Sequence, residues 1–328
     1  MSVSSVSRRV RDVLRGVADK VVELDYPINY RERSIDFVAT IGEHSKDRKP
    51  QQLSNKGSIV VRISSSKSSG INSEVENDLA KFADALDGIP IVIDDEVYDN
   101  IVFDYGKIFV SNERTLENVI RERELITIYR RNELYVALNV GLIEREINRG
   151  SLRISDISNI LGLSKKSVEN CLKGLGLVSI DKAEKLVSEY GSNMILSINY
   201  GNLREIFVKK NLPRSSLVKE VSTRALVYSL NKTAVDVVMR EVAPEGESSL
   251  RFYVDFSKTQ SVKYVKAKIL NALRLAREFS ALTEVVISDQ SSLDLLRREI
   301  ENEVGGEVSQ YIKFSSSSRV YTFQRSST

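Results

Sequence analysis

ISDISNILGLSKKSVENCL, residues 154–172, consists of two short amphipathic segments joined at a glycine. Gly162 can adopt the positive φ that a tight turn between two helices requires. Ser158, four residues earlier, is small enough for the point where two helices cross, and Ser164 is a good N-cap for the second helix. The spacing therefore predicts a helix-turn-helix whose wedge is filled by five apolar residues, Ile157, Leu161, Leu163, Val168 and Cys171.

The outward face of the second predicted helix is polar and basic at its N-terminal end. In a helix-turn-helix this end approaches base edges in the major groove, where lysine can donate to guanine or phosphate and asparagine can pair with adenine. We predict that Lys165, Lys166 and Ser167 contact bases or phosphates and that Asn170 reads a base. Ser164 caps this helix, Glu169 also lies on its outward face, and Arg153 and Lys173 are predicted to contact phosphates. The predicted DNA-binding set is therefore Arg153, Ser164, Lys165, Lys166, Ser167, Glu169, Asn170 and Lys173.

A helical hairpin inside a larger core is the alternative interpretation of the same residues. Its lysines would simply be solvated, and the nearly balanced charge of residues 141–191 agrees with that alternative. The lysines cluster, however, at the helix end that a DNA-binding motif uses, which favours DNA binding. Cys171 is interpreted as a small buried hydrophobe rather than a reactive thiol.

LGLSKKSVENCLKG (161–174) resembles the second half of a Cro-repressor-type helix-turn-helix, and SIDKAEKLVSEYG (179–191) resembles the helix that follows it. Together with SIDFVAT (34–40), ENDLAKFADALDGIPIVI (76–93) and NELYVALN (132–139), the layout is similar to that of the archaeal family called putative HTH-type transcriptional regulatory proteins. The resemblance covers roughly residues 8–192 and implies a transcription regulator. Cys171 stands where the motif usually has an aromatic residue, a difference that can alter how the helix is seated, although a small apolar residue can also serve there.

The surrounding sequence predicts a multidomain α+β or α/β protein, with a central all-α Cro-type domain between two α/β domains of endonuclease-like topology. The predicted order is an α/β domain, the helix-turn-helix domain, a linker and a second α/β domain, at residues 1–125, 126–192, 193–214 and 215–328.

The second α/β domain is a candidate duplicate of the first. In the first, a strand containing Asp36 is followed by another strand, a helix that we expect to end at Gly88, and a further strand. In the second, a helix predicted over residues 215–230 precedes a strand region with Asp236 and then the same succession. Element order and the position of the aspartate both agree between the two regions.

This order also resembles restriction-endonuclease-like folds such as archaeal Holliday-junction resolvases. Those enzymes hold Mg²⁺ with an aspartate and with an E-x-K triplet on the next strand. Here the next strands contain Val60-Val61-Arg62 and Tyr253-Val254-Asp255, so neither has the triplet. We therefore interpret Asp36 and Asp236 as structural residues of inactive endonuclease-like domains. A structure-selective, Mg²⁺-dependent nuclease of the Holliday-junction-resolvase type is the alternative function, and a protein-interaction scaffold is the third.

Composition limits the available chemistry. The 328 residues include one histidine, His44, and one cysteine. These are too few for a histidine- and cysteine-based zinc site or for an intramolecular disulfide, and they argue against a histidine-based catalytic triad. Neither a phosphate loop nor a dinucleotide fingerprint is visible, and we expect no metal, no cofactor and no catalytic residues. The first twenty residues lack the apolar core of a signal peptide, and no apolar run is long enough for a membrane helix. We expect a cytoplasmic, nucleoid-associated protein.

The expected partners are double-stranded DNA, a second copy of the chain in a homodimer, and the transcription machinery. The net charge of +3 is too small to predict nucleic-acid binding by itself. Two local basic clusters could add phosphate contacts, although a solvated face is the preferred interpretation. They consist of Arg8, Arg9, Arg11 and Arg15 in the first predicted helix, and Lys46, Arg48 and Lys49 in a loop.

Overall fold

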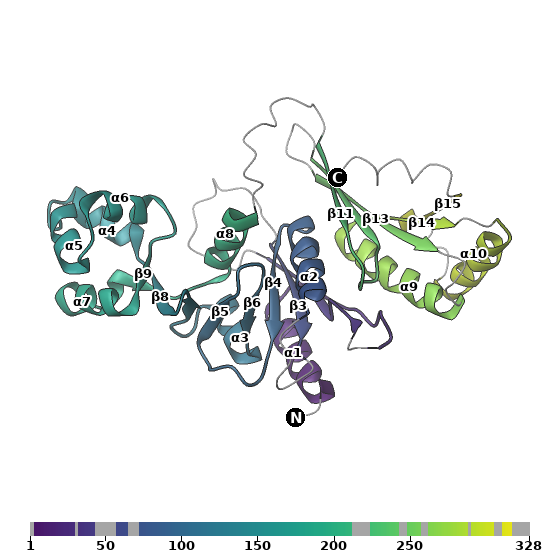
Figure 1. The fold of residues 1–328 in the computed structure, drawn as a ribbon, viewed down its shortest axis with the longest axis horizontal. Coiled ribbons are helices and arrows are strands. Elements are labelled where there is room, and N and C mark those ends of the chain that lie inside the picture. Colours follow the sequence, from purple (N-terminus) through teal and green to yellow (C-terminus); the bar gives the residue numbers. More distant parts are fainter. Residues whose placement is uncertain are drawn as a thin grey trace. The chain divides into compact units, whose positions relative to one another are not determined.

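The structure, a computed structural model, describes residues 3–29, 32–42, 57–64, 72–211, 224–242, 248–256, 262–287, 290–304 and 310–316. The chain divides into two compact units. Figure 1 labels their helices and strands. Unit 1 comprises residues 1–17 and 91–212, and unit 2 comprises residues 18–90 and 213–328. His44 and the loop cluster of Lys46, Arg48 and Lys49 lie outside the described residues. Within the described part, no helix is both long and apolar enough to cross a membrane.

Unit 1 is built on a sheet of short strands with helices packed against it. Its strands follow the order β4-β6-β5-β7-β8-β10, and β9 also pairs with β8. The strands are β4 (Gly88–Ile93, which enters from unit 2), β5 (Ile101–Asp104), β6 (Phe109–Ser111), β7 (Thr127–Arg130), β8 (Glu133–Leu138), β9 (Leu177–Ser179) and β10 (Ile195–Leu196). The helices are α1 (Val3–Val17), α3 (Glu113–Arg121), α4 (Val140–Asn148), α5 (Ile154–Leu161), α6 (Lys165–Lys173), α7 (Ile180–Tyr190) and α8 (Tyr200–Asn211).

Helix α1 buries one apolar face. Val6, Val10, Leu14 and Val17 are all buried, and α1 packs against α3. Across this contact the Arg9 guanidinium pairs with the Glu113 carboxylate at 2.5 Å. Arg9 is therefore engaged in an ion pair within unit 1, a contact that the solvated-face interpretation of this cluster did not include.

The expectation of an all-α domain over residues 126–192 is wrong, because three strands lie in that range. β7 and β8 form an antiparallel hairpin, and β9 pairs with β8 through Val136 and Val178. Residues 193–214, expected to be a linker with at most a short helix over residues 202–210, include β10, which pairs with β8, and α8, whose Leu203, Ile206 and Phe207 are buried. Sequence alternation over three residues is too short to reveal strands such as β9, whose partners are distant in sequence.

Unit 2 combines residues from both ends of the chain. From the first half come β1 (Lys20–Glu23), β2 (Phe37–Ile41), β3 (Gly57–Ile63), α2 (Ser73–Ala85) and the start of β4. β1, β2 and β3 are successive antiparallel neighbours. From the second half comes a sheet in the order β11-β12-β13-β14-β15, antiparallel as far as β13 and parallel beyond it. Its elements are β11 (Arg224–Ser229), β12 (Val237–Val242), β13 (Ser248–Phe256), α9 (Val262–Phe279), β14 (Leu282–Ile287), α10 (Gln290–Val304) and β15 (Ile312–Ser316).

Two local predictions in unit 2 are wrong. The helix expected over residues 215–230 is strand β11 from Arg224 onwards, because that segment pairs along its whole length with β12; residues 215–223 lie outside the described part. Helix α2 ends not at Gly88 but before Asp87, which itself adopts a φ of 54°. Gly88 instead opens β4, where a Cβ would lie 2.4 Å from the Ser58 carbonyl oxygen. Glycine is therefore required at position 88 because the backbone of Ser58 approaches it closely, and not because it ends the helix.

Candidate nucleic-acid interface

Helices α5 and α6 are joined by the tight turn that the sequence predicts. Gly162 follows α5 with φ 59° and ψ 38°, the left-handed conformation that glycine adopts without steric cost. Its neighbour Leu163 donates its backbone N–H to the Ser158 carbonyl at 3.0 Å, and the Ser158 hydroxyl donates back to the Leu163 carbonyl at 2.5 Å. Ser158 is small, as the predicted helix crossing requires, and its hydroxyl also stabilises the turn by a hydrogen bond. The sequence did not reveal this second role.

The second helix begins at a side-chain cap. Ser164 has extended backbone angles, and its Oγ accepts the Ser167 backbone N–H at 3.1 Å. The two hydroxyls also lie 2.8 Å apart. Ser164 therefore fixes the start of α6, and its oxygen is already occupied by α6 itself. At the other helix, the Arg153 backbone N–H is accepted by the Asp156 carboxylate at 3.2 Å, which caps α5.

The wedge between the helices is apolar and closed. Ile157, Leu161 and Val168 are at most 1% exposed, and Leu163 and Cys171 pack partly buried against them. Burial raises the pKa of the Cys171 thiol, which disfavours the reactive thiolate. The core continues into β8, β9, α4 and α7, so the pair of helices is supported from behind.

The outward face of α6 holds the residues that the sequence assigned to DNA. Lys165, Lys166 and Ser167 follow the cap at the exposed N-terminal turn, and Val168 points inward behind them. The structure leaves every member of the predicted set exposed on the same helical module, namely Arg153, Ser164, Lys165, Lys166, Ser167, Glu169, Asn170 and Lys173. The two exposed lysines at the N-terminal end of α6 provide donors of the kind that nucleic acids accept. The contacts themselves remain a prediction.

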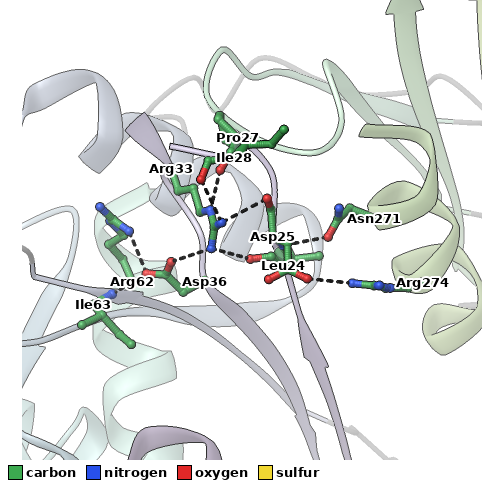
Figure 2. A network of polar contacts seen from close by, with 10 residues as sticks. All are labelled: Leu24, Asp25, Pro27, Ile28, Arg33, Asp36, Arg62, Ile63, Asn271 and Arg274. Carbon is green, nitrogen blue, oxygen red and sulfur yellow. Dashed lines mark hydrogen bonds and ion pairs between the residues drawn. The ribbon is translucent and has the colours of Figure 1, made fainter. Parts of the chain in front are cut away.

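A second charged centre, around Asp36, lies in unit 2 and is constructed in the opposite way (Figure 2). The Asp36 carboxylate is buried and accepts hydrogen bonds from the Arg62 guanidinium at 2.8 Å and from the Ile63 backbone N–H at 2.7 Å. Arg33 approaches its other oxygen at 3.8 Å. Burial raises the pKa of Asp36, and the nearby Arg62 charge opposes that effect. A guanidinium therefore occupies the face of the carboxylate that a divalent cation would need.

Asp236 lies in an analogous centre in the second half of unit 2. Its carboxylate pairs with the ammonium group of Lys268, which is 3% exposed, and accepts the Asp255 backbone N–H at 2.7 Å. Among the described residues, no group of three or more histidine, cysteine, aspartate or glutamate side chains is placed to hold a metal ion. Both aspartates are thus engaged by a buried cation of the protein and by a backbone donor of the next strand.

Comparison with known proteins gives one family match and several archaeal relatives. Residues 6–126 match a family model described as a PD-(D/E)XK superfamily domain. The chain is 24% identical over 287 residues to a protein of Sulfurisphaera tokodaii, covering 86% of this chain and 90% of that one. It is 24% identical over 299 residues to a protein of Aeropyrum pernix, covering 87% and 86% of the two chains.

A third relative, from Sulfolobus acidocaldarius, is 26% identical over 172 residues, or 52% of each chain. All three relatives bear the name "Putative HTH-type transcriptional regulatory protein". The resemblance to this archaeal group that the sequence motifs indicated is therefore confirmed. The family match over residues 6–126 fits the endonuclease-like topology predicted for that part of the chain. No solved structure matches the chain significantly.

Proposed function

We propose that this protein is a transcription regulator that binds double-stranded DNA sequence-selectively, with the N-terminal end of α6 in the major groove. The observation that carries the proposal is the contrast along α6: Val168 is fully buried, whereas Lys165 and Lys166 are exposed at the capped helix end. A helix seated in this way presents its first turn outward without disturbing its own core. The names of the archaeal relatives support the same role.

The proposal extends to assembly and location. A homodimer would place two copies of α6 on half-sites one helical turn apart, which is the usual way in which a small recognition helix gains specificity. We also propose a cytoplasmic, nucleoid-associated protein that acts together with the transcription machinery. A footprint with protection repeating at about 10 base pairs would support the dimeric arrangement.

The test uses duplexes selected from a random-sequence library by the wild-type protein. We expect Lys165→Ala with Lys166→Ala to weaken binding to the selected duplexes by at least 10-fold, on the scale of about 1–3 kcal/mol for removal of one base-reading side chain. The dependence of log affinity on log salt should also become less steep, by about one for each phosphate that the variant no longer binds.

The matched control is Lys182→Ala with Lys185→Ala on α7, which removes the same charge from the same module. If α6 enters the groove, the control variant keeps the sequence preference of the wild type and the α6 variant loses it. Equal weakening of both variants, with the preference unchanged, would show that binding is only electrostatic and would reject the proposal.

A Mg²⁺-dependent nuclease is the second candidate, because the family model that matches residues 6–126 belongs to a nuclease superfamily. Against it stands the Asp36 carboxylate, which is bound to Arg62 and to a backbone N–H. Incubation with Mg²⁺ and four-way junction DNA tests this candidate directly. Cleavage that Asp36→Asn abolishes would establish it; intact junctions at every tested protein concentration would leave the regulator.

A further inference from the structure

We infer that unit 2 is an internal pseudo-dimer: two copies of one fold, at residues 20–90 and 224–287, bind each other through the same surface of each. The partner of each copy is thus the other copy in the same chain. The inference rests on unit 2 alone and holds independently of the function proposed for α6.

The first strands of the two halves have the same hydrogen-bond register. Leu24 N–H donates to the Asp36 carbonyl, and Leu230 N–H donates to the Asp236 carbonyl, both at 2.8 Å. One strand further on, Asp36 N–H donates to the Val61 carbonyl and Asp236 N–H to the Tyr253 carbonyl, again both at 2.8 Å. Leu24 is therefore equivalent to Leu230, Asp36 to Asp236, and Val61 to Tyr253.

The aspartate side chains obey the same equivalence. The Asp36 carboxylate accepts the backbone N–H of Ile63, and the Asp236 carboxylate accepts that of Asp255, both at 2.7 Å. Ile63 and Asp255 each lie two positions after the residue whose carbonyl accepts the aspartate backbone N–H. The cations differ, since Arg62 comes from β3 and Lys268 from α9. The hydrogen bond from a backbone N–H to the aspartate carboxylate is therefore common to both halves. The cation that pairs with the carboxylate is different in each half.

The helices of the two halves also align, because both end at a residue with positive φ. This residue is Asp87 after α2, with φ 54°, and Ser280 after α9, with φ 50°. Counting nine residues back from each makes Asp78 equivalent to Asn271, and counting six back makes Lys81 equivalent to Arg274. Both helices are followed at once by a strand, β4 or β14.

The contacts between the halves are reciprocal under this alignment. The Asp78 carboxylate on α2 accepts the backbone N–H of Asn231 at 3.1 Å and that of Lys232 at 2.7 Å. The equivalent Asn271 on α9 accepts the backbone N–H of Asp25 at 2.8 Å with its Oδ1, as Figure 2 shows. Asp25 and Asn231 are themselves equivalent, because they follow Leu24 and Leu230. Each helix therefore holds the loop after the first strand of the other half.

A second pair of contacts joins the same helices to the same segments, although not at equivalent residues. The Lys81 ammonium donates to the Ser229 carbonyl at 3.0 Å, whereas the equivalent Arg274 guanidinium pairs at 3.1 Å with the carboxylate of Asp25, which is equivalent to Asn231. Between the polar contacts, the rings of Phe82 on α2 and Phe252 on β13 stack with centroids 6.4 Å apart, and both are fully buried. An interface in which residue i meets j and the equivalent of j meets the equivalent of i is the isologous type found in two-fold dimers.

The internal pairing limits the surfaces through which two chains can associate. The surface formed by α2 and the loop after β1 already has its partner inside the chain, so it is not available to pair two chains. A homodimer that reads two half-sites must use a different surface, and the internal pair needs no second chain to form.

Cross-linking of the full chain tests this inference. In a Cys171→Ser background, one variant has Lys81→Cys with Ser229→Cys, and the second has Arg274→Cys with Asp25→Cys. A short bismaleimide is added at low protein concentration, and the products are separated by mass. The four single-cysteine variants are the controls, and circular dichroism verifies that each variant is folded.

We expect both double variants to give a cross-link within one chain at comparable yield, located by peptide mass spectrometry at the introduced pair. Cross-links that join two chains would show that the halves pair between molecules, and would overturn the internal pairing. Reaction of only one of the two pairs would overturn the reciprocal, isologous arrangement. Neither outcome would depend on whether α6 binds DNA.

Discussion

The α6 surface and the Asp36 centre use the same kinds of cationic side chain for opposite purposes. Lys165 and Lys166 are exposed at a helix end, where water is their neighbour in the unbound protein. Arg62 is 5% exposed and is committed to a buried carboxylate. A buried cation that is paired with a carboxylate helps to fix one conformation and is not accessible to a ligand. An exposed cation contributes little to stability and can bind an external anion.

This contrast also separates the two candidate functions. A nuclease of the superfamily that matches residues 6–126 would need the Asp36 carboxylate to face a metal, and here it faces Arg62. A DNA-binding regulator needs exposed donors on a rigid support, and α6 has them. The expected effects of substitution therefore differ between the two regions, in stability in one and in binding in the other.

The largest expected effect on stability is that of Arg62→Met. It leaves the buried Asp36 carboxylate with the Ile63 backbone donor and the more distant Arg33 guanidinium, and loss of one partner of a buried pair costs about 3–5 kcal/mol. Chemical denaturation measures the free energy of unfolding. Adding Asp36→Asn should recover part of the loss, because the buried charge is then gone. A double variant as unstable as the single one would contradict the charge-based account.

The same variant should have a characteristic pH dependence. Burial already raises the pKa of Asp36, and removal of Arg62 raises it further. A carboxyl whose folded pKa exceeds its unfolded value destabilises the fold while it is ionised, and the folded state gains stability as pH falls through the folded pKa. We expect the deficit of Arg62→Met relative to wild type to shrink on acidification. A deficit that grows towards low pH would contradict this assignment.

A smaller loss is expected for Lys268→Met, about 1–3 kcal/mol. The Asp236 side chain is 27% exposed, against 10% for Asp36, so water can solvate the carboxylate that Lys268 leaves behind. Thermal unfolding of both single variants under one set of conditions compares the two centres. An equal or larger loss of stability for Lys268→Met would mean that burial of the carboxylate does not determine how much stability each variant loses.

Gly162→Ala should cost about 1 kcal/mol, the usual penalty for a side chain in the left-handed region. A Cβ at this position would meet nothing within 4 Å, so the cost comes from the backbone alone. Denaturant titration of the variant measures it, and Gly162→Asn is the control, since asparagine tolerates this conformation better. A loss several times larger would show that the turn is tighter than described.

The smallest stability effect is expected for Lys165→Ala with Lys166→Ala, within about 0.5 kcal/mol, as for most exposed substitutions. Differential scanning calorimetry beside the binding assay would show that the variant stays folded while it fails to bind. A large drop in melting temperature would mean that the lysines support the module itself, and would remove the contrast with Arg62.

Local patterns predicted the helix-turn-helix well because its determinants lie close together in the sequence. Gly162, Ser164 and Val168 have their roles through short-range spacing, and the structure places them accordingly. The Asp36 centre was only half predictable, since the partner Arg62 becomes adjacent through pairing of β2 with β3. Strand β11 was mistaken for a helix because its state depends on β12, and Asp87 took the role expected of Gly88.

The most direct measurement is site-specific cross-linking of α6 to DNA. In a Cys171→Ser background, a photoactivatable thiol reagent is attached at Lys166→Cys and, for comparison, at Lys185→Cys on α7. Irradiation with a duplex selected by the wild-type protein should join position 166 to bases at one fixed place in the selected sequence, and position 185 to none or only to the backbone. Base cross-links at fixed sequence from position 185 with none from position 166 would contradict the assignment of α6 as the recognition helix.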